Sequence, residues 1–144
     1  MTSLAILRGT RLTAFSILLT GCAFITDPNE KLRVSLALQQ TDDLGIVAPR
    51  ADVRATDVVV RGTFSTPCLG YSVTADAKQN KGTVEVTLRG RQAGEVCLTA
   101  IGRFPYTATV AGVSPGSHRV VVQHVIADAN WPVETVVDTT LRIP

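Results

Sequence analysis

Strict alternation of apolar and polar side chains is the feature that most constrains the fold of this chain. Apolar residues occupy every second position from Leu32 to Leu38, and the same period of two recurs in residues 71–78 and 83–89. Successive side chains of a β-strand point to opposite faces of a sheet, so this period predicts strands with one buried face. Between the last two runs, Asn80-Lys81-Gly82 supplies turn residues and predicts a hairpin.

Further segments are interpreted as strands although their alternation is less regular. No window of about 12 residues in the body of the chain keeps the helical period of 3.6, and runs rich in Gly, Pro and Asp separate the segments. About eight strands at this spacing leave no room for crossover helices. We therefore expect an all-β fold, an antiparallel Ig-like sandwich of two sheets with seven to eight strands. The additional strands are expected at residues 53–64, 95–101, 104–111, 117–126 and 133–143.

The first 21 residues have the order of an export signal. Arg8 and Arg11 are the only charged residues there, and they precede a short apolar run at residues 12–19. A helix needs about 20 apolar residues to cross a bilayer, and this run is too short for a permanent span. We therefore predict a cleaved signal peptide over residues 1–21, with Cys22 directly after the cleavage site.

The tetrapeptide Leu19-Thr20-Gly21-Cys22 resembles the lipobox of bacterial lipoproteins. In that family the signal is cut before the cysteine, the sulfur receives diacylglycerol and the freed amine is usually acylated. The resemblance implies that Cys22 carries lipid, with each buried methylene contributing ~0.8 kcal/mol to membrane binding. Ala23 is not the aspartate that marks retention at the inner membrane in enteric bacteria, which favours the outer membrane in a two-membrane organism. The alternative is an ordinary secretory signal with an unmodified Cys22.

The chain has three cysteines, an odd number for an exported protein. Lipidation of Cys22 would leave Cys68 and Cys97, for which an oxidising compartment predicts a disulfide. Such a bond closes a loop of about 30 residues and would stabilise the fold by roughly 3–4 kcal/mol. The alternative is a pair of buried reduced cysteines. A metal site would need further ligands close in sequence, and a redox role would need a Cys-x-x-Cys pair.

Residues 106–122, YTATVAGVSPGSHRVVV, resemble a segment of fibronectin-type-III and related Ig-like domains. In those domains a strand ends in a hydrophobic-x-Pro-Gly turn, and an aromatic residue and alternating valines follow. The aromatic residue is usually a tyrosine that folds back to hydrogen-bond the preceding loop, and His118 occupies its place here. The resemblance implies the sandwich architecture and carries no function.

Charge and histidine content narrow the functional classes. Without residues 1–21 the chain holds 12 basic and 12 acidic residues, so we do not expect a nucleic-acid partner. The two histidines, His118 and His124, lie on one face of one expected strand, about 20 Å apart, too far to bind one metal. We expect both to be structural. No Gly-x-Ser-x-Gly motif or nucleotide-binding glycine pattern is present, so we predict neither a cofactor nor an enzyme.

Two loop features are candidates for contact with other molecules. Trp131 follows Asp128 and Asn130 in the expected connection between the last two strands, where Ig-like domains often bind partners. Trp131 could equally cap the open end of the core, and we expect the Asp128 side chain to make an Asx turn. Arg89 and Arg91 are expected at a solvated hairpin tip, in preference to a contact with an acidic ligand.

Together these patterns predict a lipid-anchored envelope protein. Residues 22–30 form the lipidated N-terminus and a short tether, and residues 31–144 form the sandwich domain, facing the periplasm or the exterior. We expect a non-enzymatic binding or structural module that acts through its loops or an exposed strand edge. The alternatives are an accessory subunit of an envelope protein complex and, less favoured, a hydrolase.

Overall fold

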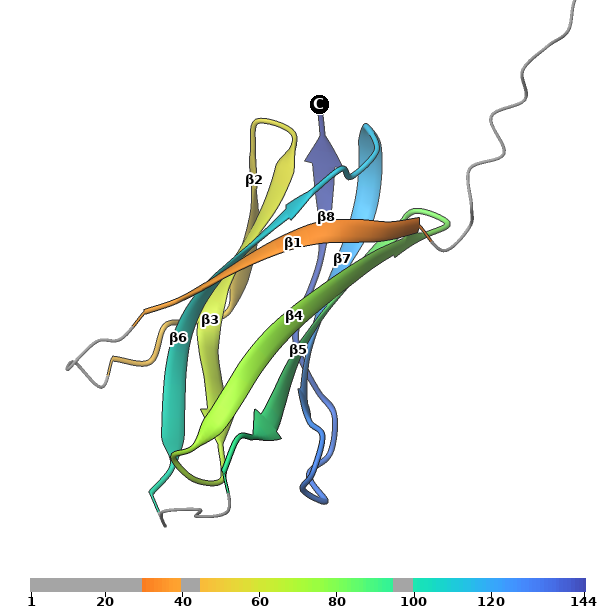
Figure 1. Ribbon diagram of the computed structural model, residues 1–144. Helices are drawn as coiled ribbons and strands as arrows, with labels where there is room; N and C mark the ends of the chain where they lie inside the picture. Colours follow the sequence, from red (N-terminus) through yellow and green to blue (C-terminus); the bar gives the residue numbers. More distant parts are fainter. Residues whose placement is uncertain (1–29, 40–44, 95–99) are drawn as a thin grey trace, which may run out of the picture.

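The computed structural model describes residues 30–39, 45–94 and 100–144, and its regular elements in these ranges are all β-strands (Figure 1). The all-β prediction is therefore confirmed. In the same ranges no helix has the length and hydrophobicity to cross a bilayer. The strands are β1 (Glu30–Leu38), β2 (Arg50–Arg54), β3 (Asp57–Thr66), β4 (Tyr71–Asn80), β5 (Thr83–Gln92), β6 (Gly102–Ala111), β7 (Gly116–Ile126) and β8 (Glu134–Ile143).

The eight strands form one mixed sheet in the order β2-β3-β6-β1-β4-β5-β7-β8. β1 joins the two halves because it changes partner along its length. Its residues 30–32 pair with β4, and its residues 33–38 pair with β6. The sheet curls until its edge strands β2 and β8 approach each other, so that it is nearly closed around the core (Figure 1).

The expectation of a purely antiparallel arrangement is wrong at one pair of strands. β5 and β7 run parallel, with Val84 opposite Val120. Parallel neighbours need a crossover connection. The chain makes this crossover with β6, which lies in the other half of the sheet between β3 and β1. The sequence pattern left no room for a crossover helix, and here a strand supplies the crossover instead.

The β4–β5 hairpin forms where the turn residues predict it. Asn80 pairs with Thr83, which leaves Lys81 and Gly82 as a two-residue turn. Both turn residues have positive φ, 43° at Lys81 and 82° at Gly82. This is the type I′ geometry that matches the twist of the flanking strands. Glycine adopts it at no steric cost, whereas lysine does so with some strain.

The single strand expected over residues 53–64 is instead a second hairpin. β2 and β3 pair antiparallel with Arg54 opposite Asp57, so the chain reverses at Ala55-Thr56. Ala55 has a φ of 52°, a left-handed conformation that favours Gly, Asn or Asp. The turn was missed because neither residue is a usual turn former and the valine-rich sequence continues directly after it.

The remaining strand predictions agree with the structure to within a few residues, with one exception. Of the strand expected at 95–101, residues 95–99 lie outside the described residues, and Ala100 and Ile101 are not in a strand. At the other end of the fold, Glu30 already belongs to β1 and not to the expected tether. The predicted signal peptide, Cys22 and the rest of the predicted tether also lie outside the described residues.

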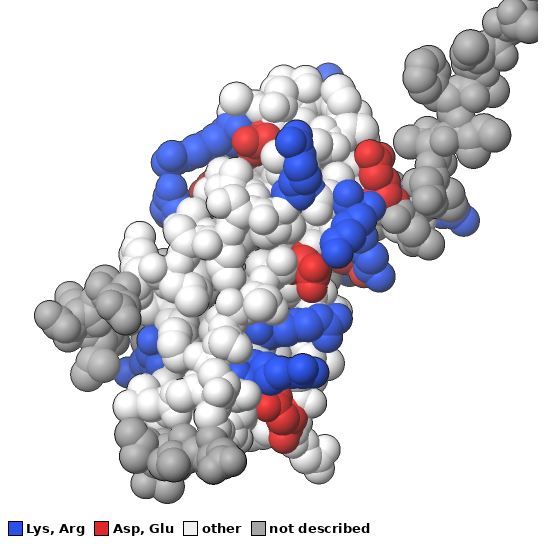
Figure 2. All heavy atoms as spheres, viewed as in Figure 1, with Lys and Arg blue, Asp and Glu red and all other residues white. Residues whose placement is uncertain are grey.

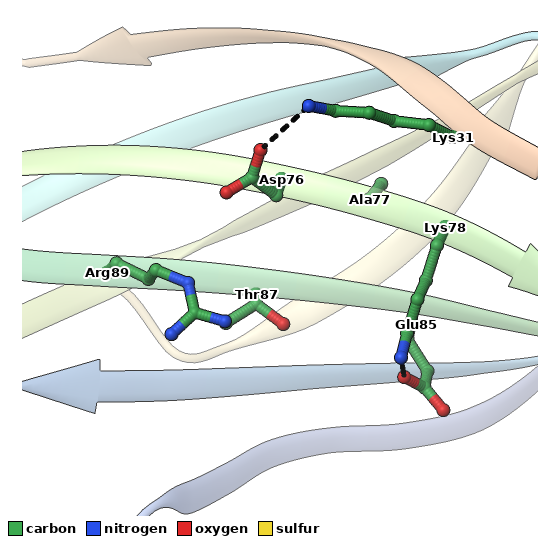
Figure 3. Close-up of a pocket in the computed structure, with 7 residues that line it drawn as sticks. All are labelled: Lys31, Asp76, Ala77, Lys78, Glu85, Thr87 and Arg89. Carbon is green, nitrogen blue, oxygen red and sulfur yellow. Dashed lines mark ion pairs between the residues drawn. The ribbon is translucent and has the colours of Figure 1, made fainter. Parts of the chain in front are cut away.

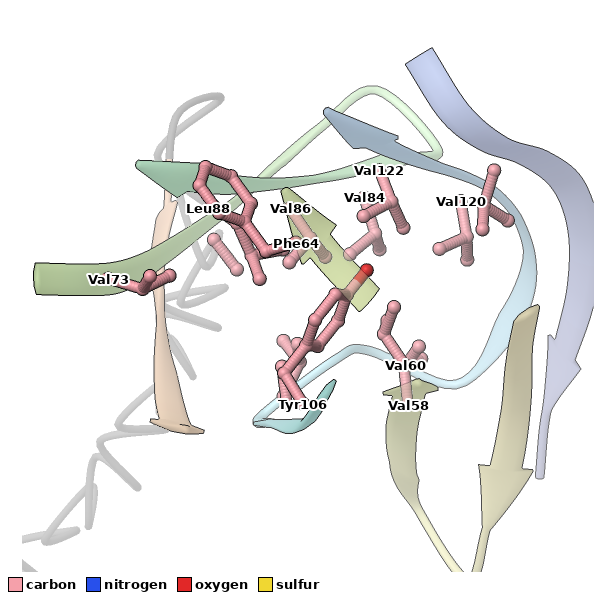
Figure 4. Packing of buried hydrophobic residues seen from close by; sticks show 14 of the residues in the cluster. Val58, Val60, Phe64, Val73, Val84, Val86, Leu88, Tyr106, Val120 and Val122 are labelled. Atoms are coloured by element: carbon pink, nitrogen blue, oxygen red, sulfur yellow. The ribbon is translucent and has the colours of Figure 1, made fainter. Parts of the chain in front are cut away.

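The core is built from valines around two large aromatic rings. Phe64 of β3 and Tyr106 of β6 are almost fully buried, and valines from β3, β5 and β7 surround them (Figure 4). β-Branched side chains suit a pleated, half-buried surface, and so the inward positions of the strands fill the interior. The fully buried valines are Val58, Val60, Val84, Val86, Val110, Val120 and Val122.

Two glycines in the middle of strands make room for the aromatic rings. A Cβ at Gly62 would lie 2.8 Å from the Tyr106 hydroxyl, and a Cβ at Gly90 would lie 2.7 Å from the Phe64 ring. Both distances are shorter than side chains tolerate. Interior strand glycines commonly mark such close approaches, and here they allow large rings to fill a small interior.

Candidate binding surfaces

The connection between β7 and β8 carries the loop residues singled out from the sequence. The Asp128 carboxylate accepts a hydrogen bond from the backbone N–H of Gln92 at 2.6 Å. One residue earlier, the Ala127 N–H donates to the Gly90 carbonyl at 2.9 Å. Asp128 therefore holds the loop against the end of β5, a contact to a neighbouring strand in place of the expected Asx turn. Asn130 is exposed.

Trp131 lies at an end of the molecule where apolar side chains are exposed. The connections β3–β4 and β7–β8 lie at this end, at the bottom of Figure 1, as do the end of β5 and the start of β6. We call the large, exposed apolar side chains beside these strand ends the apolar loop end. Its residues remain between 45% and 63% exposed, so Trp131 does not form a closed lid over the core. The apolar loop end consists of Leu69, Ile101, Trp131 and Val133.

The apolar loop end lies opposite the place where the N-terminal segment enters the fold. Glu30 pairs with Gln79 near the finish of β4, whereas Tyr71 begins β4 beside the β3–β4 connection. Ten residues of strand separate the two ends, which corresponds to roughly 30 Å. Any molecule that contacts the apolar loop end therefore meets the end of the domain opposite the start of β1.

His124 belongs to a buried cluster with the two large aromatic residues. Its Nε2 lies 3.0 Å from the Tyr106 hydroxyl, and its ring centroid lies 4.8 Å from that of Phe64. Burial disfavours the imidazolium and lowers the pKa of His124 to about 4. Burial likewise raises the pKa of Tyr106 to about 12. His124 is therefore a neutral, buried ring that packs against Phe64 and hydrogen-bonds to Tyr106.

His118 folds back onto the turn that precedes it. Its Nε2 lies 2.8 Å from the Ser114 carbonyl oxygen, so that the ring donates to the β6–β7 turn. The residue is also buried, at 6% exposure. This is the contact that the resemblance to fibronectin-type-III domains implies for the aromatic residue at this position. His118 and His124 lie on the same face of β7, as expected, and this face is the buried one.

The cysteine predictions involve residues that the structure describes only in part. Cys68 is buried at 2% exposure directly before β4, and its carbonyl accepts a hydrogen bond from the Thr66 hydroxyl at 2.7 Å. Cys22 and Cys97 lie outside the described residues. The lipid attachment and the Cys68–Cys97 disulfide therefore stay predictions. The described residues contain no group of three side chains able to hold a metal ion.

A polar groove of about 420 Å³ runs along the outer face of β1, β4 and β5 (Figure 3). Charges of both signs line it, and charges of both signs also mix over this side of the molecule in Figure 2. Two ion pairs cross it, Lys31 with Asp76 at 3.9 Å and Lys78 with Glu85 at 2.8 Å. Arg89 lies beside Thr87 in the same groove.

The placement of Arg89 and Arg91 corrects the sequence prediction. They were expected at a hairpin tip, but β5 continues to Gln92, so both side chains stand on the outer face of a strand. Arg89 lies opposite Thr74, and Arg91 opposite Ser72, on β4. Within the described part of the chain, no carboxylate oxygen lies within 4.0 Å of either guanidinium. The hairpin tip was predicted in the wrong place because Gly90 was interpreted as a turn residue. Gly90 instead lies within β5, where the absence of a side chain makes room for the Phe64 ring.

Arg119, on the same molecule, is an exposed arginine that pairs with a carboxylate. Its Nε and a terminal nitrogen donate to the two carboxylate oxygens of Asp138, at 2.8 and 2.5 Å. These hydrogen bonds hold the pKa of the Asp138 carboxyl below its ordinary value. Arg89 is also an exposed arginine, but it lacks such a partner among the described residues.

Comparison with known families identifies the family of the domain. A family model described as the ORF11 beta-sandwich domain matches residues 58–131, just over half of the chain. The chain belongs to this family. The matched region of the ORF11 beta-sandwich domain begins in β3 and ends at Trp131, so it includes the buried cluster of His124 and both outer arginines of β5. Neither the search of curated proteins nor that of solved structures gave a match.

Proposed function

We propose that this protein is a lipoprotein of the bacterial cell envelope, anchored through Cys22. The support is the sequence Leu19-Thr20-Gly21-Cys22 directly after a basic segment and an apolar run. Because β1 begins at Glu30, the tether from Cys22 could span at most about 30 Å. The sandwich would then lie close to the membrane, which is the outer membrane in a two-membrane organism.

The domain then acts as a non-enzymatic module that binds an apolar surface of another envelope protein through its apolar loop end. The observation that carries this proposal is the exposure of Trp131 and the three other residues of the apolar loop end, at the end of the fold opposite the start of β1. Tryptophan is strongly enriched among residues that dominate binding energy. A tether at one end and exposed apolar loops at the other would orient the module toward its partner.

Two finer structural features belong to the same proposal. A Cys68–Cys97 disulfide would fasten the β5–β6 connection beside the start of β4, in keeping with an oxidising compartment. The two parts of the curled sheet on either side of β1, namely β2-β3-β6 and β4-β5-β7-β8, would correspond to the two layers of an Ig-like sandwich. The resemblance of residues 106–122 to fibronectin-type-III domains supports this layering.

The anchor is tested by metabolic labelling with a palmitate analogue in the native host. Wild-type protein should be labelled, and Cys22→Ser should abolish the label, because the acceptor sulfur is gone. A Cys68→Ser variant serves as the matched cysteine control and should retain the label. Label that survives in Cys22→Ser would show that the lipobox interpretation is wrong.

The binding module is tested by affinity capture from detergent-solubilised native envelope with three baits. Wild type should capture a stoichiometric protein partner, and Trp131→Ser should lose it. Ile46→Ser, which alters an exposed apolar residue of the β1–β2 connection, should retain it. Capture that is unchanged in Trp131→Ser, or the absence of any partner with wild type, would contradict the proposal.

A further inference from the structure

The groove on the outer face of β1, β4 and β5 holds one cation that its own carboxylates do not neutralise. Lys31 pairs with Asp76 and Lys78 pairs with Glu85, which leaves Arg89. We propose that this groove binds the carboxylate of a small polar ligand, with Arg89 as the anchoring residue.

Arginine chemistry defines the group that Arg89 would take. A guanidinium presents a planar fork of N–H donors that matches the two oxygens of a carboxylate. The pair of Arg119 and Asp138 makes this two-point contact elsewhere on the surface. At Arg89, the carboxylate of the ligand makes the contact with the guanidinium that the Asp138 carboxylate makes with Arg119. Arg91, two residues farther along the same face of β5, adds positive charge on one side.

The neighbours of Arg89 define the rest of the ligand. Thr74 lies directly opposite on β4, and Thr87 offers a hydroxyl beside it in the groove. The Asp76 side chain is 55% exposed, and its ion pair with Lys31 is long, at 3.9 Å. Its carboxylate can therefore also accept a hydrogen bond from a ligand N–H or O–H. A polar ligand with one carboxylate and several donors and acceptors fits this lining.

The size and lining of the groove exclude other ligand classes. A volume of about 420 Å³ falls within the range of small-molecule sites, which is roughly 300–1,000 Å³. Its lining contains no aromatic residue and only Ala77 as an apolar one, so its apolar surface comes mainly from the aliphatic stems of charged and polar side chains, whose polar ends favour a polar ligand. The mixed charges disfavour a long polyanion, which would meet Asp76 and Glu85.

The proposal concerns a different face from the apolar loop end. It does not depend on the lipid anchor or on a protein partner, and a failure of either would leave it intact. The carboxylate could come from a peptide terminus or from a sugar acid. The experiment therefore uses a probe of each kind together with its uncharged counterpart.

Saturation-transfer NMR on the full chain in detergent micelles provides the measurement. The acidic probes are N-acetyl-alanyl-alanine and methyl glucuronoside, and their neutral counterparts are the dipeptide amide and methyl glucoside. At least one acid should receive saturation while its neutral counterpart receives little, and added salt should weaken the effect. The acid that binds identifies the source of the carboxylate.

Variants then locate the site. Arg89→Gln should weaken binding of the acid by about tenfold or more, because hydrogen bonds to a charged group are lost. Arg142→Gln, which removes an exposed arginine of β8, should leave binding unchanged. Equal transfer to the acids and their neutral counterparts, no transfer to either acid, or unchanged affinity in Arg89→Gln would each overturn the proposal.

Discussion

Replacement of the buried His124 gives the most direct test of how this core is built. The ring lies in the core beside Phe64 and Tyr106, and its pKa falls from 6.5 to about 4. The folded protein therefore takes up this proton only near pH 4, whereas the unfolded chain takes it up near pH 6.5. Stability from this group is fully present above pH 6.5 and is lost as the pH falls toward 4.

The size of the effect follows from the shift. At 1.36 kcal/mol per pKa unit, the shift corresponds to about 3 kcal/mol in total, of which about 2 kcal/mol is lost by about pH 5. His124→Gln keeps a side chain that can hydrogen-bond to Tyr106 but does not titrate. The stability difference between wild type and His124→Gln should therefore shift by about 2 kcal/mol, in favour of the variant, between about pH 8 and about pH 5.

Urea unfolding at both pH values gives the two free energies of unfolding for each protein. The carboxylates titrate in both proteins and cancel in the comparison. Tyr106→Phe is the matched control, because it removes the phenol but keeps the titrating ring, so its pH dependence should resemble that of wild type. A stability difference between wild type and His124→Gln that stays constant over this pH range would refute the reasoning.

Three further predictions concern packing, a turn and the cysteines. Gly90→Ala should destabilise the protein by roughly 1–3 kcal/mol in urea unfolding, because the new Cβ meets an aromatic ring, whereas Gly45→Ala, with nothing within 4 Å, should be nearly neutral. Equal effects would contradict the packing account. Lys81→Asn should raise the free energy of unfolding by about 0.5–1 kcal/mol, because it creates the preferred Asn-Gly turn. A lower free energy of unfolding would show that Lys81 is not strained in the type I′ turn. Non-reducing mass analysis should find Cys68 and Cys97 joined and two hydrogens lighter than the dithiol, and free thiols would exclude the disulfide.

Local patterns in the sequence were sufficient for most strands but not for their pairing. The Lys81-Gly82 turn could be predicted because Gly82 adopts positive φ at no steric cost, and the residues on either side of the turn pair with each other in space. The turn at Ala55 carries no such residue and was missed. The parallel pairing of β5 with β7 depends on where β6 lies in the other half of the sheet, which no local pattern records.

In the candidate sites, too, contacts within one short segment were predictable and contacts between distant strands were not. The contact between His118 and the turn before it was predictable because both belong to one short segment. The cluster of His124 brings together β3, β6 and β7, and sequence reasoning did not find it. Gly62 and Gly90, glycines in otherwise regular strands, were the available signal, since they indicate that a large side chain passes close to the backbone.

The division of β1 between two partners has a mechanical consequence. If the N-terminal segment is anchored, any pull on it acts first on the three residues that pair with β4, while six residues still hold to β6. Detaching the first three would bare the edge of β4 and open the seam between the two halves of the sheet. The strand on which such a pull would act, β1, is thus also the strand that joins the two halves of the sheet.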